Sequence, residues 1–277
     1  MEENLRARKS LGQNFLHDRK VIKKIVSAGL SNTGNILEIG AGTGNLTAEI
    51  LSQKGKHQKL IALEIDTNLI QTLCDRFESE IKVGDIEIIH ADIQNFDFDI
   101  MGDDYGIIAN IPYYLSGGII RKIFSQENLP VYVALILQRE VAERIVEADG
   151  HGSILSNSVR AFGTPKIQFR IGSGAFVPAP SVDSALLTVS NISRDHFVDD
   201  VSDGEYFDLL HLAFRHKRKQ LINNLSLLLS RQELMKVFAE LDFRPDIRAE
   251  ELSVGDWFNL LRKIQGYTMT NARRKEN

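Results

Sequence analysis

The first 150 residues alternate between short, mostly apolar runs and segments with the apolar spacing of helices. Short apolar runs predict buried strands, and apolar residues three or four positions apart predict amphipathic helices. A regular alternation of the two is typical of βαβ units with a parallel sheet. The predicted strands are 36–39, 59–63, 86–89, 105–109 and 131–137, and the predicted helices are 45–53, 66–80, 116–124 and 138–147.

The pattern changes after about residue 166. Residues 167–171 and 184–189 predict two strands, which could pair antiparallel and close the sheet, and a Gly/Pro-rich link at 172–180 joins them. Residues 191–204 are polar and predict a linker, after which only helical spacing continues to about residue 265. We therefore expect an α/β domain over 1–190, with a mostly parallel sheet and an antiparallel last strand, and a small all-helical domain over 191–277.

Composition narrows the possible sites. The 277 residues are 43% hydrophobic, enough for a substantial core, and include one cysteine, Cys74. A single thiol excludes an internal disulfide and any multi-cysteine zinc or iron–sulfur site, so we expect no metal. The N-terminus lacks an apolar signal core and no stretch is long enough to span a bilayer, which favours a cytoplasmic protein, expected to be a monomer, without a membrane partner.

The distribution of charge is more informative about binding than the net charge of −4. Basic residues cluster at 6–9, 215–219 and 273–275. Such patches on an acidic chain can still contact phosphates. For 273–275 a solvated tail is the better reading, whereas for 215–219 phosphate binding and a solvated helix face fit equally well. The candidate phosphate contacts are Arg8, Lys9, Arg215, Lys217, Arg218 and Lys219.

The motif Asn110-Ile111-Pro112-Tyr113 follows the predicted strand 105–109. Ligands of open α/β sheets bind at this edge, beyond the carboxyl ends of the strands. The Asn110 side-chain oxygen and the Ile111 carbonyl could both accept hydrogen bonds from one amino group, while Tyr113 stacks on the ring that carries it. Taken alone, the motif fits an ordinary Asn-x-Pro turn better.

A glycine loop, Gly40-Ala-Gly-Thr-Gly44, follows the first predicted strand and starts a helix. Glu64 ends the next strand and Asp92 the third, where carboxylates could hold a ribose and an adenine amine. These features favour an adenosine cofactor, and both NAD and S-adenosylmethionine fit. The Gly-x-Gly-x-Gly spacing and Glu38, which could face a cationic amino group, favour S-adenosylmethionine. The absence of a Gly-Lys-Ser/Thr motif disfavours nucleoside triphosphate hydrolysis.

Together, the glycine loop and the Asn110 motif resemble the amino-methyltransferases that act on bases. More narrowly, the chain resembles the ribosomal RNA small-subunit adenine dimethyltransferases of the KsgA type. The resemblance covers nearly the whole chain, because four further segments carry it: 9–16, 174–185, 213–224 and 244–253. The chain departs from the family pattern at two positions. An Ala rather than Pro follows Gly40, and Ser181 stands where a Lys is usual, which removes one expected phosphate contact.

The resemblance implies a Rossmann-like, S-adenosylmethionine-dependent methyltransferase fold. It implies that two adjacent adenosines near the 3′ end of small-subunit (16S) rRNA are each methylated twice, within a pre-ribosomal particle. Phe176 is expected to close the second face of the target base, although a core position fits it about as well. The residues expected at the cofactor are Gln13, Asn14, Leu16, Glu38, Gly40, Gly42, Glu64, Ile65, Asp92, Ile93 and Asn110.

Three alternatives compete with this interpretation. The Erm methyltransferases, which modify large-subunit (23S) rRNA, share the Asn110 type of motif. A non-catalytic assembly factor would have no need of the acceptor pair at Asn110 and Ile111. An NAD oxidoreductase would need catalytic residues that are not evident and would leave the Asn110 motif unexplained.

Overall fold

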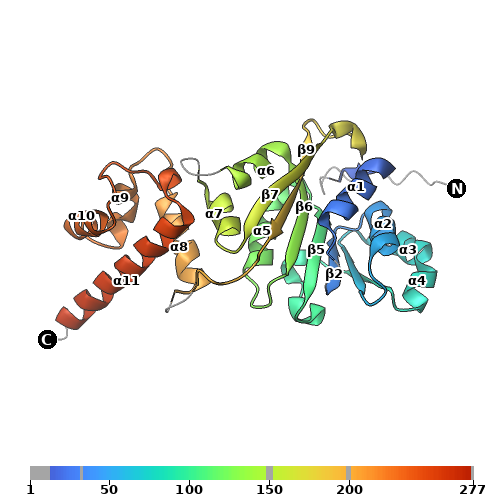
Figure 1. Ribbon diagram of the computed structural model, residues 1–277, viewed down its shortest axis with the longest axis horizontal. Coiled ribbons are helices and arrows are strands. Elements are labelled where there is room, and N and C mark those ends of the chain that lie inside the picture. Colours follow the sequence, from blue (N-terminus) through green and yellow to red (C-terminus); the bar gives the residue numbers. More distant parts are fainter. Residues whose placement is uncertain (1–12, 32–33, 148–151, 198–200, 276–277) are drawn as a thin grey trace. The chain divides into compact units, whose positions relative to one another are not determined.

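The computed structural model describes residues 13–31, 34–147, 152–197 and 201–275. Its contacts divide the chain into two compact units, one of 1–143 with 163–192 and one of 144–162 with 193–277 (Figure 1). The sequence-based boundary after residue 190 differs from this division at 144–162, which group with the helical unit.

The first unit contains a sheet of seven strands in the order β4-β3-β2-β5-β6-β9-β7. The five strands from β4 to β6 are parallel, and β9 runs antiparallel to its neighbours β6 and β7. The mostly parallel sheet with an antiparallel closing strand is therefore confirmed. The bounds are β2 (Asn35–Ile39), β3 (Leu60–Glu64), β4 (Ile86–His90), β5 (Tyr105–Asn110), β6 (Tyr132–Gln138), β7 (Thr164–Ile171) and β9 (Ser184–Ser190).

Helices cover this sheet, and most lie where the apolar spacing predicts them. The predicted helix 66–80 is interrupted at Phe77, whose φ of −113° departs from helical geometry. Asp66 caps the first of its two parts by accepting a hydrogen bond from the Asn68 backbone at 3.1 Å. The helices are α1 (Arg19–Gly29), α2 (Asn45–Gln53), α3 (Thr67–Arg76), α4 (Glu78–Lys82), α5 (Ser116–Phe124) and α6 (Arg139–Val146).

A second, two-stranded sheet was not foreseen from the sequence. Its strands β1 (Phe15–Leu16) and β8 (Phe176–Val177) pair antiparallel, with Leu16 opposite Phe176. Two residues are too few to show a period, so no local pattern marks either strand. The pairing attaches the N-terminal segment to the loop that precedes β9.

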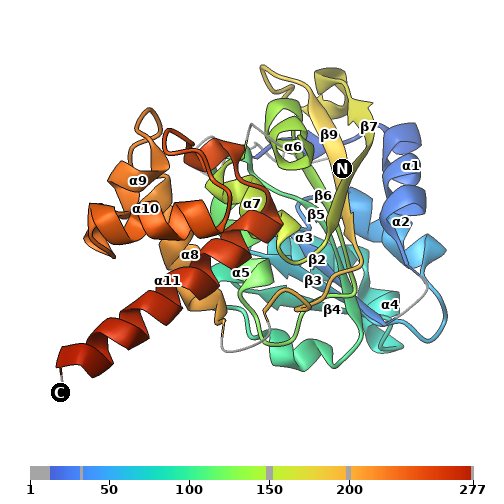
Figure 2. The same cartoon turned by 60° about the vertical axis from the view of Figure 1, so that its left-hand side comes forward.

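The second unit is helical, as the sequence predicts, and Figure 2 shows its helices clearly. Ser202 and Ser230 begin two of the helices with capping boxes, each paired with a glutamate three residues later. Phe197 stacks on Phe162, at 4.7 Å between ring centroids, so part of the expected linker 191–204 belongs to this unit's aromatic core. The helices are α7 (Ile154–Arg160), α8 (Asp203–Ala213), α9 (Leu221–Asn224), α10 (Arg231–Glu240) and α11 (Val254–Lys275).

The basic segment 215–219 corrects an expectation. The sequence predicts helical structure through this segment, but α8 ends at Ala213 and α9 begins only at Leu221. The Asn224 side chain donates to the carbonyls of Ala213 and His216, which stabilises the turn between the helices. The cations of 215–219 therefore project from a turn rather than from one helix face.

Candidate active site

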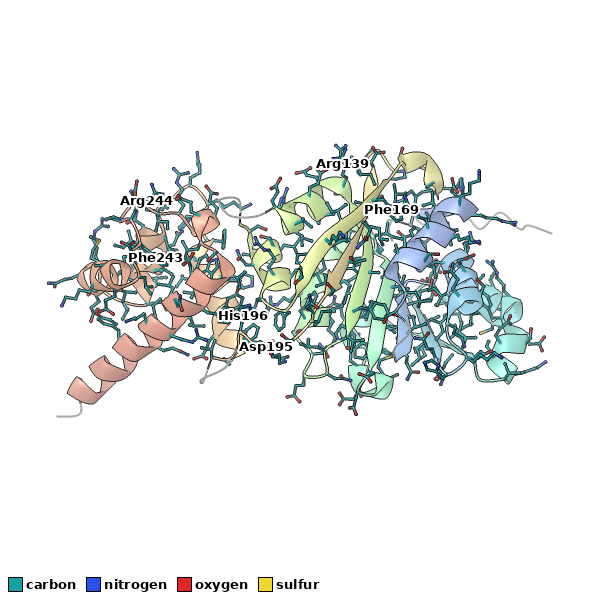
Figure 3. All side chains as sticks on the ribbon, viewed as in Figure 1. Arg139, Phe169, Asp195, His196, Phe243 and Arg244 are labelled. Carbon is teal, nitrogen blue, oxygen red and sulfur yellow. The ribbon has the colours of Figure 1, made fainter. Side chains whose placement is uncertain are left out.

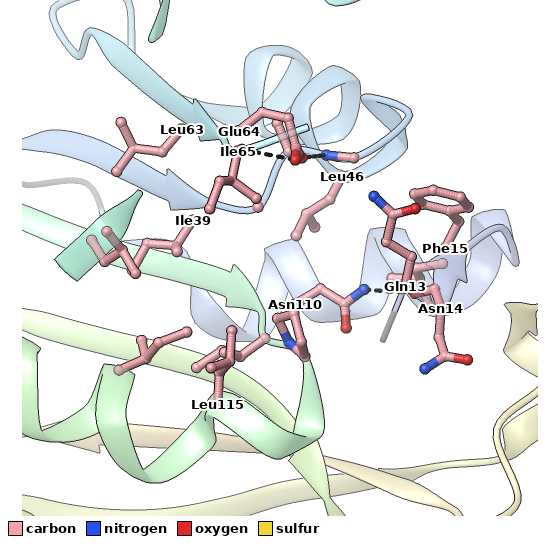
Figure 4. Close-up of a pocket in the computed structure, with 18 of the residues that line it drawn as sticks. Gln13, Asn14, Phe15, Ile39, Leu46, Leu63, Glu64, Ile65, Asn110 and Leu115 are labelled. Carbon is pink, nitrogen blue, oxygen red and sulfur yellow. Dashed lines mark hydrogen bonds between the residues drawn. The ribbon is translucent and has the colours of Figure 1, made fainter. Parts of the chain in front are cut away.

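A pocket lies at the carboxyl ends of the parallel strands of the first unit, where α/β sheets bind ligands. The ends of β2, β3 and β5 form its floor, and residues 13–16 form the opposite wall (Figure 4). The pocket brings together most of the residues that the sequence singled out for the cofactor and the target base. Those that line it are Gln13, Asn14, Leu16, Gly40, Gly42, Glu64, Ile65, Asp92, Ile93, Asn110, Ile111, Pro112 and Tyr113.

The glycine loop lines the pocket with backbone. Gly40 and Gly42 have φ values of 76° and 60°, the left-handed region that glycine adopts without strain. A Cβ added at Gly42 would lie 3.2 Å from the Phe15 ring, so there is also little room for a side chain at this position. The loop therefore allows a ligand to approach its backbone closely.

Glu64 is fixed by the backbone around it. One carboxylate oxygen accepts from Gly42 N at 2.8 Å, and the other accepts from Ile65 N at 2.9 Å and Asp66 N at 2.8 Å. The side chain is only 5% exposed, so these bonds compensate the burial of its charge. Each oxygen has two acceptor sites, so the oxygen bound to Gly42 can still accept from a ligand hydroxyl.

Asp92 and two isoleucines form the next part of the wall. Asp92 Oδ1 accepts from Gln94 N at 2.9 Å, which leaves Oδ2 available to an external donor such as an amino group. Ile65 is 49% exposed and Ile93 is buried, and both line the pocket. An apolar wall beside one carboxylate suits a flat heterocycle that carries an exocyclic amine.

The orientation of Asn110 is set by the N-terminal segment. Its side-chain Nδ2 donates to the backbone carbonyl of Asn14 at 3.1 Å (Figure 4). Since a carbonyl can only accept, the nitrogen must face Asn14, and the Asn110 oxygen is left to accept. No turn or loop hydrogen bond within the described residues uses the Ile111 carbonyl. Both oxygens of the predicted acceptor pair therefore belong to residues that line the pocket, and neither forms one of the hydrogen bonds described above.

The N-terminal segment is itself held at several points. Gln13 Nε2 donates to Asp66 Oδ2 at 3.1 Å, and Asn45 Nδ2 donates to the Leu16 carbonyl at 3.0 Å. His17 N adds a bond to the Ala175 carbonyl at 2.9 Å. These bonds, together with the β1–β8 pairing, place the Asn14 carbonyl where it contacts Asn110.

Tyr113 is half-buried at the pocket mouth, and its hydroxyl lies 2.6 Å from the Ser184 hydroxyl. Burial raises the pKa of Tyr113, the Ser184 hydrogen bond lowers it, and the charge of Asp183 raises it further. The phenol is therefore neutral at physiological pH, and its contact with Ser184 restrains the ring.

Two of the residues predicted to contact the cofactor or the target base do not line the pocket. Side chains alternate along a strand, and because Ile39 faces the pocket, Glu38 faces the other way. Glu38 is fully buried, and neither of its oxygens has a hydrogen-bond partner of normal geometry among the described residues. Phe176 is 1% exposed and packs in the core beside Leu16, so in this structure its ring does not cover a base.

Burial raises the pKa of Glu38 to about 8; the Thr47 hydroxyl lowers it, the Glu64 charge raises it and Arg76 lowers it. The carboxyl is therefore mainly protonated near neutral pH. A neutral acid outside the pocket does not provide the cationic group of a ligand with a charge partner, so the predicted contact is not supported by this geometry.

The basic candidates are not part of the pocket. Arg8 and Lys9 lie outside the described residues. Arg215, Lys217, Arg218 and Lys219 belong to the second unit and are exposed, and no ion pair of theirs is found in the described part of the chain. Ser181, the departure from the family pattern, is exposed in the first unit.

Sequence reasoning missed three residues that position the site: Asn45, Asp66 and Ser184. Asp66 was predicted only as the first residue of a helix, and Ser184 lies in the segment 174–185 that carries the family resemblance, where no role was assigned to it. Their contacts join residues 29, 53 and 71 positions apart, which no local pattern reports.

The described residues contain neither a cluster of metal-binding side chains nor a helix suited to a membrane. Within the ranges that the structure describes, no three His, Cys, Asp or Glu side chains gather closely enough to hold a metal ion. Over the same ranges, no helix combines the length and apolar character needed to cross a membrane.

Comparison with known proteins identifies the family. Residues 4–266 match the family model described as ribosomal RNA adenine dimethylase. The chain belongs to this family. Proteins of the ribosomal RNA adenine dimethylase family are methyltransferases, so the chain is an enzyme of that class.

Its relatives share most of its length. The chain is 35% identical over 259 residues to a ribosomal RNA small subunit methyltransferase A of Dehalococcoides mccartyi, covering 91% of this chain and 87% of that one. It is 34% identical to the protein of the same name from Mycoplasmopsis pulmonis, covering 94% of this chain and all of the relative.

Solved structures support the fold. A dimethyladenosine transferase from Plasmodium falciparum aligns with a TM-score of 0.77 at 25% identity, covering 91% of this chain and 98% of the other. The 23S rRNA methyltransferase ErmE aligns with a TM-score of 0.70 at 20% identity, covering 91% and 100%, which shows a shared fold. The Rossmann-like methyltransferase fold expected for the dimethylase family is confirmed.

Proposed function

We propose that this protein transfers methyl groups from S-adenosylmethionine to the exocyclic amines of two adjacent adenosines near the 3′ end of small-subunit (16S) rRNA. The observation that carries the proposal is the orientation of Asn110. Its nitrogen donates to the Asn14 carbonyl, and its oxygen and the Ile111 carbonyl remain as a pair of acceptors beside the pocket.

The pocket suits S-adenosylmethionine. The left-handed glycines allow close approach to the backbone, Glu64 has acceptor capacity for ribose hydroxyls, and Asp92 Oδ2 can accept from the adenine amine. Ile65 and Ile93 provide apolar surface for the ring. When bound, S-adenosylmethionine supplies an electrophilic methyl group on its sulfonium.

The acceptor pair explains how the chain activates a weak nucleophile. The lone pair of an adenine amine is delocalised into the ring. Hydrogen bonds from its two N–H groups to Asn110 and Ile111 favour a more tetrahedral nitrogen with a localised lone pair. They also align that nitrogen, and alignment supplies much of the rate in reactions of this kind. The amine becomes acidic as it is alkylated, so the reaction needs no strong base.

Tyr113 completes the arrangement as a stacking surface for a base turned out of its strand. Because its hydroxyl is held by Ser184, the ring loses little conformational freedom when the base binds. The proposal requires neither a metal ion nor a second copy of the chain. The expected setting is a pre-ribosomal small subunit in the cytoplasm, with the exposed cations of 215–219 contacting phosphates.

The specific substrate is supported by the relatives, which are named small subunit methyltransferases over nearly the whole chain. The test is transfer of a labelled methyl group to purified, unmodified small and large ribosomal subunits, followed by mapping of the modified nucleotides. Label on two neighbouring adenosines of the small-subunit rRNA is expected. Label on large-subunit rRNA alone would instead assign the Erm-type activity.

A further inference from the structure

A second hollow adjoins the pocket on the outside of the Asn110 motif. It is lined by Asn14, Tyr113, Tyr114 and Gln138. Asn14 and Tyr113 line both cavities, so the hollow is continuous with the place proposed for the target base. It lies at the carboxyl edge of the sheet, because Gln138 is the last residue of β6, next to β5.

Tyr114 is the main surface of this hollow. Its side chain is 61% exposed, whereas the neighbouring Tyr113 is half-buried and hydrogen-bonded. Leu115, the next residue, is 39% exposed and lines the main pocket. Exposed apolar side chains that adjoin a pocket mark a binding surface, and an aromatic ring suits any nucleobase because every base offers a flat face.

The polar residues of the hollow suit the edge of a base. Asn14 and Gln138 carry primary amides, each with two donors and an acceptor, the groups with which proteins read nucleobase edges. Gln138 is half-buried, and its amide makes no side-chain hydrogen bond with the described residues. A ligand that pairs with this amide would therefore displace no protein contact.

The hollow is built from the same parts that fix the reacting site. Gln138 lies opposite Ser184 in the β6–β9 register, and Ser184 holds the Tyr113 hydroxyl. The backbone of Asn14 holds Asn110. A base in the hollow would thus be positioned relative to the base at Asn110.

Charged side chains of both signs lie beside the hollow. Arg139 follows Gln138 at the start of α6 and is 46% exposed (Figure 3). Its Nε lies 3.8 Å from Glu143, which also accepts from Arg170 at 3.0 Å. Glu143 is therefore shared by two cations, while two further exposed carboxylates lie at the same edge: Glu140, and Asp183, whose backbone carbonyl accepts from Arg139 N at 2.9 Å.

We infer that this hollow is a subsite for the nucleotide next to the target adenosine, whose base stacks on Tyr114 and pairs with the Gln138 amide. The inference rests on the proposed function, because it takes the base at Asn110 as its reference. It adds a specificity contact to the reaction: the enzyme would read one neighbour of the adenosine that it methylates.

The test uses the full chain and an RNA oligonucleotide with one target adenosine and 2-aminopurine as its neighbour. Stacking on Tyr114 should quench the fluorescence of the 2-aminopurine. Tyr114→Ala should abolish the quenching and weaken binding of this RNA roughly tenfold, as loss of one stacked base does, while Tyr114→Phe should retain both. Gln138→Glu, which replaces the amide donor by an acceptor, should change the preference among the four bases at this position.

Val83→Ala is the matched control, because Val83 is 75% exposed and lies outside both cavities. Quenching and affinity that are unchanged in Tyr114→Ala would overturn the subsite. Methyl transfer to purified, unmodified small ribosomal subunits, measured with the same enzyme preparations, separates this inference from the proposed function. Quenching that depends on Tyr114, in an enzyme that does not methylate small subunits, would reject the function and keep the hollow as a base-binding surface. Methylation of small subunits with unchanged quenching in Tyr114→Ala would keep the function and reject the subsite.

Discussion

The Tyr113 hydroxyl lies 2.6 Å from the Ser184 hydroxyl, which joins the residue proposed to stack on the target base to the first residue of β9. Ser184 is fully buried, so its hydroxyl cannot turn to solvent for another partner. We expect Ser184→Ala to lower kcat about fivefold, the worth of one neutral hydrogen bond, with little change in the KM for S-adenosylmethionine.

A double-mutant cycle distinguishes this positioning role from a general effect on folding. In a Tyr113→Phe background the partner hydroxyl is already absent, so Ser184→Ala should have almost no further effect on kcat. Independent losses that multiply in the double variant would contradict the assignment.

Asn110 should tolerate no change to its amide. In Asn110→Asp a carboxylate oxygen faces the Asn14 carbonyl in place of the donor that now lies 3.1 Å from it. We expect kcat to fall at least a hundredfold in single-turnover methylation, because both the acceptor geometry and the alignment are lost. Asn128→Ala is the control, because the Asn128 amide also donates to a backbone carbonyl, that of Gly102, away from the pocket.

Glu64 should govern cofactor affinity. Glu64→Gln removes the charge that accepts three backbone N–H bonds and turns an amide donor toward one of them. Binding of S-adenosylmethionine, measured by calorimetry, should weaken tenfold or more. Glu87→Gln on the neighbouring strand, where the carboxylate is 49% exposed, controls for loss of a charge; equal affinities in the two variants would reject the role.

Glu38 should make stability depend on pH. Its pKa rises from 4.5 to about 8 on folding, so between these values the folded protein binds the proton more tightly than the unfolded chain does. The stabilising contribution is complete below about pH 4.5 and is lost as pH rises toward 8.

We therefore expect Glu38→Gln to raise the Tm by several degrees at pH 8 relative to wild type, and to flatten the decline in Tm between pH 5 and pH 8. Glu78→Gln, on a side chain that is 70% exposed, controls for the loss of a surface carboxyl. A decline of the same slope in Glu38→Gln and wild type would show that another group is responsible.

The exposed cations between α8 and α9 should contribute salt-dependent RNA affinity. Joint replacement of Arg215, Lys217, Arg218 and Lys219 by Ala should weaken binding to small-subunit rRNA. It should also reduce the slope of log affinity against log salt by up to about 3, since each single-strand phosphate contact contributes roughly 0.7. Joint replacement of the exposed Lys20 and Lys23 on α1 is the control. An unaltered slope in the quadruple variant would exclude these residues as phosphate contacts.

The sequence predicts those parts of the molecule that depend on local patterns. The apolar runs locate every strand of the large sheet, and α2 and α5 begin and end where their spacing indicates. The glycine loop, Glu64 and Asn110 follow from their places at strand ends, because parallel strands bring those ends to one edge.

What the sequence does not predict depends on contacts between distant residues. The β1–β8 pair, the Ser184 bond and the Asn14–Asn110 bond each join segments more than 70 residues apart. Glu38 shows that a motif does not by itself predict the direction of a side chain. Its place in the motif suggested a ligand contact, but the alternation of side chains along β2 turns it away from the pocket.

The pairing of Leu16 with Phe176 has a consequence for the order in which the enzyme becomes active. The two residues are 160 positions apart, so a growing chain has made its glycine loop, Glu64 and Asn110 well before β8 exists to hold the N-terminal wall. Until then the N-terminal segment lacks the β1–β8 pairing and the bond from His17 N to the Ala175 carbonyl, two of the contacts that place the Asn14 carbonyl against Asn110. Methyl transfer should therefore be absent from nascent chains and begin only after the loop before β9 has been synthesised.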